Sequence, residues 1–237
     1  MIHATDTTMA AIIVAGGSGS RFNAGYNKVF ELLDQKPIWF HSVGCFAMRD
    51  DVVSITLVLP ESDRDTFDEQ SRRWPLQHPV KLAPSGQQRF DSVASGLAST
   101  ARDLAPLIAI HDAARPLVTQ SDITAVAEAA DRDGAAVLAQ PISGSVKRLK
   151  GTLANNVDRR GLHVAQTPQV FKQDVIRQAY ERHHGFPVTD DAQLVESSGH
   201  PVTLVPGART NIKLTYPDDL LIAESILKSN RKYESSG

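Results

Sequence analysis

The stretch MAAIIVAGGSGSRFNAGYNK, residues 9–28, joins a continuous apolar run to a segment rich in glycine. An uninterrupted apolar run of this kind is typical of a strand that helices cover on both faces, as in a parallel sheet. Four glycines follow it, together with Arg21 and Lys28. The stretch therefore predicts a buried first strand that ends in a turn where ligands of open α/β sheets bind.

The glycine-rich turn matches neither of two common phosphate-binding motifs. A Walker A loop has a glycine, four residues and then Gly-Lys-Ser/Thr, which no glycine here begins. The dinucleotide pattern starts at Gly17 and Gly19 but has Phe22 where its third glycine should stand. What remains is a turn whose backbone N–H groups face an anion, with Arg21 and Lys28 beside it. A tight β–α connection with a solvated arginine is the alternative.

Composition places the chain among ordinary globular proteins. Its 237 residues are 41% hydrophobic and 22% charged, with a formal net charge of -2. This balance excludes a disordered chain and gives no reason to expect a nucleic-acid partner. One cysteine, Cys45, excludes an internal disulfide and fits a reducing compartment. No apolar run reaches the roughly 18 residues of a membrane span, and no signal peptide is visible, so we expect a cytoplasmic protein.

Short apolar runs alternate with amphipathic stretches along most of the chain. This alternation predicts a single α/β domain over residues 1–237, with a Rossmann-like, mostly parallel sheet flanked by helices. The expected strands are residues 11–14, 53–59, 80–83, 107–110, 135–139 and 202–205. The expected helices are residues 37–47, 62–74 with Ser62 as the cap, 89–100, 122–131, 172–183, 190–198 and 217–227.

The alternation breaks between residues 142 and 168. Polar alternation around Lys150 and Gly151 predicts a protruding β-hairpin arm that leaves the sheet. A projecting hairpin must cover its apolar residues elsewhere, so we expect it to pair two copies of the chain as a homodimer.

A second candidate for ligand chemistry is HDAARP, residues 111–116, directly after an apolar strand. An aspartate at that strand end can hold Mg²⁺ against phosphate oxygens, because this cation takes oxygen ligands and few carboxylates. Taken alone, Asp112 caps the next turn just as readily.

The order of motifs along the chain resembles one family. These motifs are AGGSGSR with Lys28, SGQQRFDS at 85–92, HDAARP, DRRGL at 158–162 with TPQ at 167–169, TDDA at 189–192 and NIK at 211–213. They are similar to those of the 2-C-methyl-D-erythritol 4-phosphate cytidylyltransferases. The resemblance implies that CTP and methylerythritol phosphate are joined into CDP-methylerythritol with release of pyrophosphate, with Mg²⁺ as cofactor and a homodimer as the usual assembly.

The resemblance also implies roles for particular residues. The catalytic cations would be Arg21, Lys28 and Lys213. The nucleotide would contact Ala15, Gly16, Gly17, Gly19, Gly86, Gln87, Ser92, Asp112 and Ala113, and Asp112 would hold the metal. The sugar-alcohol phosphate would contact Arg115, Ser145, Arg159, Thr167 and Thr189, some of them from the neighbouring subunit's hairpin.

The chain departs from the family's pattern at four places. Asn27 stands before Lys28 where the family has proline, so the lysine loses a neighbour whose ring fixes φ. Gly144 replaces an aspartate before Ser145, Thr210 replaces an aspartate before NIK, and Gln87 replaces an acidic residue. These departures affect the expected acceptor site more than the triphosphate site.

Three other interpretations compete with this one. Ribitol-5-phosphate cytidylyltransferases share nearly every motif but typically have HDSVRP, so Ala113 and Ala114 favour the erythritol enzyme. A non-catalytic nucleotide-binding module is compatible with the departures at Gly144 and Thr210. A dinucleotide-dependent oxidoreductase is disfavoured by Phe22.

Overall fold

The computed structural model describes residues 7–17, 26–183, 185 and 187–234. The strands are β1 (Met9–Val14), β2 (Leu32–Leu33), β3 (Lys36–Pro37), β4 (Val52–Leu59), β5 (Val80–Pro84), β6 (Leu107–Asp112), β7 (Ala135–Pro141), β8 (Val146–Lys150), β9 (Leu153–Val157), β10 (His163–Lys172) and β11 (Thr203–Pro206). The helices are α1 (Ile38–Ala47), α2 (Arg64–Arg73), α3 (Arg89–Ala98), α4 (Gln120–Asp133), α5 (Gln173–Glu181), α6 (Asp191–Ser197) and α7 (Asp218–Glu234), with short 3-10 turns η1 (Lys28–Phe30) and η2 (Glu61–Asp63).

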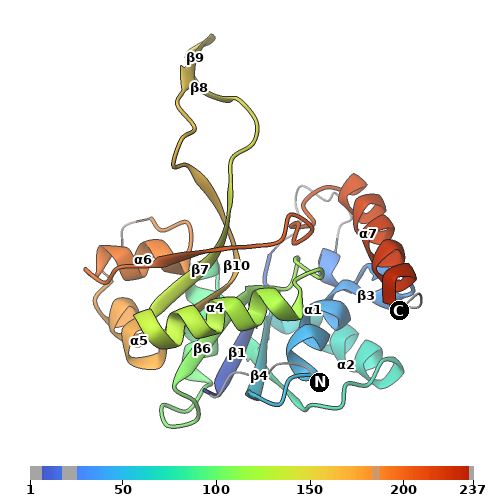
Figure 1. The fold of residues 1–237 in the computed structure, drawn as a ribbon. Coiled ribbons are helices and arrows are strands. Elements are labelled where there is room, and N and C mark those ends of the chain that lie inside the picture. Colours follow the sequence, from blue (N-terminus) through green and yellow to red (C-terminus); the bar gives the residue numbers. More distant parts are fainter. Residues whose placement is uncertain (1–6, 18–25, 184, 186, 235–237) are drawn as a thin grey trace.

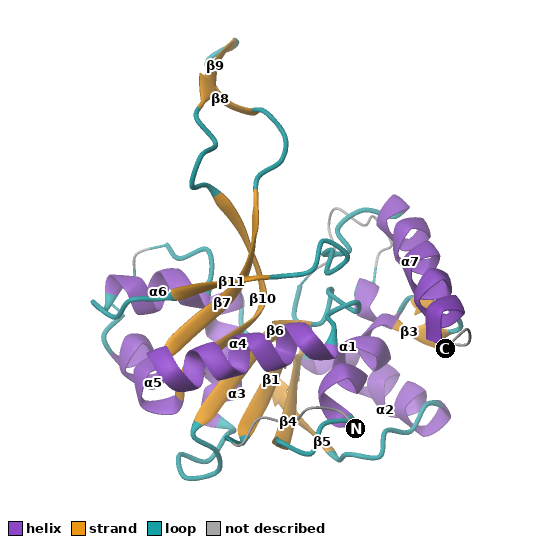
Figure 2. Cartoon of the chain, viewed as in Figure 1, coloured by secondary structure: helices purple, strands orange, loops and turns teal. Residues whose placement is uncertain are grey.

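Seven strands form one mixed sheet in the order β11-β7-β10-β6-β1-β4-β5. β1 pairs in parallel with β4 and β6, β4 with β5, and β11 with β7, whereas β10 runs antiparallel to both of its neighbours. The predicted Rossmann-like, mostly parallel α/β fold is therefore confirmed, and Figure 2 shows helices on both sides of the sheet.

β10 is an interior strand of the sheet that was not predicted from the sequence. Residues 163–168 were assigned to the end of the hairpin, yet β10 lies between β7 and β6. Its polar residues and Pro168 conceal it, since a proline normally argues against a central strand. Here the proline falls in a register shift between Ala165 and Gln169, where pairing with β7 is interrupted.

The side chains of strand β1 belong to two apolar clusters, one on each face of the sheet. Met9, Ala11 and Ile13 pack into a buried cluster with residues of α1 and α4. Ala10 and Ile12 point to the opposite face and pack with residues of α3, α5 and α6. Because successive side chains of a strand alternate between faces, a fully apolar strand requires helices on both. Each buried isoleucine contributes about 1.5–3 kcal/mol to stability.

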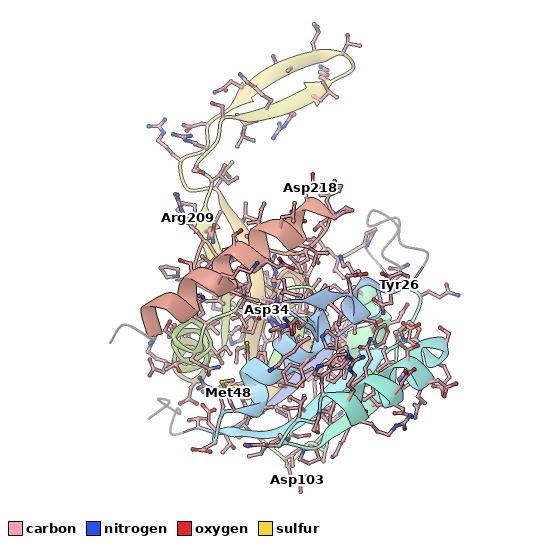
Figure 3. All side chains as sticks on the ribbon, turned by 90° about the vertical axis from the view of Figure 1, so that its right-hand side faces the viewer. Tyr26, Asp34, Met48, Asp103, Arg209 and Asp218 are labelled. Atoms are coloured by element: carbon pink, nitrogen blue, oxygen red, sulfur yellow. The ribbon has the colours of Figure 1, made fainter. Side chains whose placement is uncertain are left out.

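The last helix closes over the carboxyl edge of the sheet. A third apolar cluster joins α7 and the segment before it to β2 and α1, through Leu33, Ile38, Leu117, Leu214 and Ala223. Figure 3 shows α7 lying across the surface, with Asp218 at its first turn. The backbone N–H of Leu214 donates to the carbonyl of Ala114 at 2.8 Å. The chain therefore returns to the end of β6 about a hundred residues after leaving it.

The arm projects from the sheet as an extension of β7 and β10, with β8 and β9 at its tip (Figure 1). Its apolar side chains Leu149 and Leu153 are 71% and 74% exposed. Figure 3 shows Asp103, before β6, at the end of the molecule opposite the arm. One smaller expectation was wrong: Ser62 lies inside η2, and α2 begins after Asp63 without a side-chain cap.

Close packing of α3 on the sheet gives a test of the fold. A Cβ at Gly96 would lie 2.5 Å from Ile12 Cγ2 and 3.1 Å from Val58 Cγ2. We expect Gly96→Ala to lower the free energy of unfolding by about 1–3 kcal/mol through overpacking, despite the better helix propensity of alanine.

Gly44 in α1 is the matched control, because nothing lies within 4 Å of a Cβ built there. We expect Gly44→Ala to raise the free energy of unfolding by about 1 kcal/mol. Urea denaturation measures both, and equal effects of the two variants would contradict this packing.

Candidate active site

A cavity of about 360 Å³ opens at the carboxyl ends of β1, β5 and β6. Nine of the residues predicted to bind the nucleotide or to act in catalysis line it, namely Ala15, Gly16, Gly17, Lys28, Gly86, Gln87, Ser92, Asp112 and Lys213. Gly19 and Arg21 lie outside the described residues. The structure thus brings to one cavity residues as distant in the sequence as Ala15 and Lys213.

Two glycines bring the backbone close together at the cavity wall. A Cβ on Gly16 would lie 2.6 Å from Ser85 Cβ, so only glycine fits between the first turn and the turn after β5. A Cβ on Gly86 would collide with the side chain of Asp91. The Gly86 N–H donates to Ser92 Oγ at 3.1 Å, and this hydroxyl donates to the carbonyl of Gln88. Ser92 therefore shapes the turn that was expected to contact the nucleotide.

Asp112 is a buried carboxylate that lines the cavity. Its Oδ2 lies 2.6 Å from Lys213 Nζ and its Oδ1 lies 3.2 Å from Arg89 Nε. Burial disfavours the charged carboxylate, but the Arg89 and Lys213 charges outweigh that cost and hold the pKa of Asp112 well below its usual range. Both carboxylate oxygens therefore face cations.

Arg89, which lines the cavity at the first turn of α3, was not among the residues predicted from the sequence. Besides Asp112, it pairs with Asp191 Oδ2 at 2.6 Å, and Asp191 Oδ1 accepts the hydroxyl of Tyr180 at 2.7 Å. Burial opposes the charge of Arg89, but the two carboxylates raise its pKa above the usual value. The motifs RFDS and TDDA, which carry Arg89 and Asp191, were the available signal. Their mutual contact was not visible in sequence.

The two lysines approach each other through the segment before α7. Lys28 Nζ donates to the carbonyl of Leu214 at 2.6 Å, and Lys213 is the adjacent residue. Both lysines line the cavity that the glycine turn also walls. An arrangement of this kind suits a ligand with several negative charges.

Residues of the HDAARP segment divide between core and cavity. Ala113 is fully buried, and its N–H donates to the carbonyl of Val14 at 2.9 Å. Ala114, which was not predicted, lines the cavity instead. Arg115 Nη1 donates to the carbonyl of Asn211 at 2.8 Å, while its Nε is buried without a hydrogen-bond partner.

The remaining predicted acceptor residues lie on three parts of the chain, namely β10, the segment before α6 and the arm. Thr167 is buried beside β6, where its Oγ1 accepts the N–H of Asp112 at 3.0 Å. Thr189 lies before α6 and donates to Gln193 Oε1 at 3.0 Å. Ser145 and Arg159 lie on the arm, where Arg159 donates to the carbonyl of Ser143. The arm points away from the body that holds the cavity (Figure 1).

His111 is a fully buried link behind Asp112. Its Nε2 lies 3.0 Å from the Arg115 carbonyl, which can only accept, so Nε2 carries the proton. Its Nδ1 then accepts the hydroxyl of Thr167 at 3.1 Å. Burial lowers the pKa of His111 to about 4, which keeps the ring neutral at physiological pH.

Two findings concern metal ions and membranes in the part of the chain that the structure describes. There, no group of three His, Cys, Asp or Glu side chains could hold a metal ion. Among the helices of residues 7–17, 26–183, 185 and 187–234, none combines the length and the apolar character that crossing a bilayer requires.

Fold and charge together define a class. A cavity at the carboxyl edge of a doubly wound sheet, walled by glycine backbone and lined by lysines, belongs to α/β proteins that bind phosphorylated nucleotides. The chain belongs to the 2-C-methyl-D-erythritol 4-phosphate cytidylyltransferase family, whose sequence profile matches residues 9–229. The resemblance inferred from the motifs is thereby confirmed.

Named relatives agree with this membership. The chain is 46% identical to the 2-C-methyl-D-erythritol 4-phosphate cytidylyltransferase of Rhodopirellula baltica, over 94% of this chain and 96% of the relative. It is 40% identical to the enzyme of the same name in Bacillus velezensis, over 92% and 95%. A crystal structure of the Thermus thermophilus cytidylyltransferase, 29% identical, superposes with a TM-score of 0.75 over 94% of this chain and 100% of that one.

The buried neutral His111 predicts a pH dependence of stability. Its pKa is about 4 in the folded chain and 6.5 for the ordinary group, so below pH 6.5 the unfolded state binds a proton that the folded state does not. The free energy of unfolding should therefore fall by on the order of 3 kcal/mol between pH 6.5 and 4, and should be independent of this group above pH 7.

Urea denaturation across this pH range, compared between the native chain and His111→Gln, measures the contribution. His163→Gln, which removes an exposed side chain on the arm, serves as control. Equal slopes for the native chain and His111→Gln would show that the buried ring does not titrate as the structure implies.

Proposed function

We propose that this chain joins CTP to 2-C-methyl-D-erythritol 4-phosphate, giving CDP-methylerythritol and pyrophosphate in isoprenoid biosynthesis. One observation carries the proposal: in a chain of this family, Lys28, Lys213 and Asp112 converge with the glycine turn on one cavity. Relatives at 46% and 40% identity bear the name of this activity.

The chemistry requires charge stabilisation rather than a protein nucleophile. An oxygen of the acceptor phosphate forms a bond to the α-phosphorus of CTP, and the bond from that phosphorus to the bridging oxygen of pyrophosphate breaks. Because the attacking oxygen is already anionic, no general base is required. This agrees with the state of His111, both of whose ring nitrogens are occupied.

The cations of the chain would act on charge that builds during transfer. We assign Lys28 and Lys213 to the α-phosphate and Arg21 to the departing pyrophosphate. The turn at Gly86 and Gln87 offers backbone acceptors to the cytosine amino group.

Asp112 fits a divalent cation such as Mg²⁺, because this cation takes one or two carboxylates and completes its shell with phosphate oxygens and water. When bound, the cation would neutralise triphosphate charge. Lys213, which pairs with Asp112 and lines the same cavity, would meet the α-phosphate beside this carboxylate.

A homodimer would complete the acceptor site. In this proposal, Arg115, Thr167, Thr189 and Lys213 of one chain meet Ser145 and Arg159 from the partner's arm. The exposed leucines of the arm support the idea, because an isolated chain leaves them in water. We place the reaction in the cytoplasm, in keeping with the single cysteine.

The reaction is tested by offering purified protein CTP, Mg²⁺ and each acceptor in turn, with release of pyrophosphate as the readout. We expect turnover with methylerythritol phosphate. Faster release with ribitol 5-phosphate would reassign the acceptor. Tight CTP binding by calorimetry without turnover on any sugar phosphate would favour a non-catalytic binding module.

Removing either cavity lysine should slow the chemistry without unfolding the chain. We expect Lys28→Ala and Lys213→Ala each to lower kcat by more than about tenfold, because each deletes charge matched to the transition state. Lys228→Ala, an exposed lysine of α7, is the control. Activity assays and thermal melts of the variants test this prediction. A fall in activity matched by a fall in Tm would indicate a structural role instead.

The arm's contribution is tested at Arg159. We expect Arg159→Ala to raise KM for the sugar phosphate about tenfold while leaving KM for CTP within about twofold, because the guanidinium would face only the acceptor phosphate. The adjacent Arg160, which pairs with Asp158, provides the matched control Arg160→Ala. Steady-state kinetics measure both, and a parallel rise in KM for CTP would contradict the assignment.

A further inference from the structure

The side chain of Asn27 makes three hydrogen bonds at the start of η1. Its Nδ2 donates to the carbonyl of Ala15 at 2.6 Å and to Asp63 Oδ2 at 2.8 Å. Its Oδ1 accepts the backbone N–H of Val29 at 3.3 Å. The residue is 8% exposed, so these bonds lie largely out of water. A side chain that replaces the family's proline is thus fully engaged.

The partners of Asn27 stand at the ends of two neighbouring strands. Ala15 directly follows β1 and donates its N–H to the carbonyl of Val58 in β4 at 2.7 Å. Asp63 belongs to η2, which follows β4. β1 and β4 pair in parallel, so both anchors follow the carboxyl ends of neighbouring strands. Asn27 therefore ties the residue before Lys28 back to the point where the glycine-rich segment begins.

This tie fixes the backbone of Lys28. Asn27 is the N-cap of η1, and the two residues after Lys28, Val29 and Phe30, are 3% and 8% exposed in the core. Lys28 therefore stands between a hydrogen-bonded residue and two packed ones. Its Nζ reaches the carbonyl of Leu214 at 2.6 Å, beside Lys213.

The backbone conformation of Asn27 is one that both asparagine and the family's proline can adopt at this position. Its φ is −71°, inside the narrow range near −65° that a proline ring imposes. A proline in this place restrains φ covalently but offers no amide. Asn27 accepts the same φ and restrains the segment with side-chain hydrogen bonds. The expectation that Lys28 loses its stiffening neighbour is corrected by these contacts.

We infer that Asn27 is a positioning residue for nucleotidyl transfer, because its amide fastens the Lys28 backbone to the ends of β1 and β4 and so directs Lys28 into the cavity. The inference rests on the proposed function. It predicts that Asn27 acts through Lys28, so its effect should depend on the presence of that lysine.

The test is a double-mutant cycle at positions 27 and 28, with kcat, KM for CTP and thermal melting as readouts. We expect Asn27→Ala to lower kcat about tenfold with little change in KM for CTP, since misplaced charge weakens the transition state more than ground-state binding. In the Lys28→Ala background the same change should cost less than about threefold, because the residue it positions is gone.

Asn27→Pro is the matched rescue variant. We expect it to keep at least about a third of the native kcat, because the ring restrains φ near the observed value. Asp63→Ala should lower kcat by about threefold, since it removes one of the two acceptors of the Asn27 amide and leaves the other.

Each outcome bears on the inference. Native kcat in Asn27→Ala, or the same fold-loss with and without Lys28, would overturn it. If Asn27→Ala does not fold, Asp63→Ala decides, and an unchanged kcat in that variant overturns the inference. A native chain that turns over no sugar phosphate refutes the proposed function itself, whereas native turnover with an unaffected Asn27→Ala refutes only the role of Asn27.

Discussion

A carboxylate buried at the end of a central strand must be paired, and in this chain the pairing organises the cavity. Asp112 lies at the last position of β6, where the sheet edge leaves it only 8% exposed. An unpaired charge there would be costly, so Lys213 and Arg89 are drawn to its two oxygens. The same pairing keeps cations beside the glycine turn, where a polyanion needs them.

Satisfying Asp112 ties together elements that share no local sequence. Arg89 begins α3 and also pairs with Asp191 at the start of α6, so two helices on the same face of the sheet are connected to the cavity wall. Lys213 arrives on the segment before α7, whose packing through Leu214 against α1 holds that segment in place. The packing of these helices therefore also determines where the cations lie. A shift of α3 or of the segment before α7 would separate a cation from Asp112.

The central antiparallel strand adds a second constraint. The middle of β10 brings Thr167 against His111 and the N–H of Asp112, so the strand that begins in the arm passes beside the buried carboxylate. β10 therefore connects the arm to the residues behind the cavity. A partner that binds the arm would bind an extension of this strand. Figure 2 shows this strand running from the arm into the body.

Sequence by itself determined the layers of the fold and the identity of most cavity residues. Alternation of apolar runs and helical stretches depends on local periodicity, and the motifs at Gly16, Asp112 and Lys213 stand at predicted strand or helix ends, where ligands of α/β sheets bind. It also indicated the arm, because polar alternation around Gly151 is a local signal.

Only the tertiary structure decided which polar residues touch. β10 was hidden because its inward positions carry glutamine and threonine, whose burial depends on partners supplied by other strands. Arg89 and Asn27 were undervalued for the same reason: a hydrogen bond between residues 27 and 63, or 89 and 191, follows from strand order and not from spacing along the chain. Periodicity reports burial, whereas the pairing of buried polar groups is set by three-dimensional neighbours.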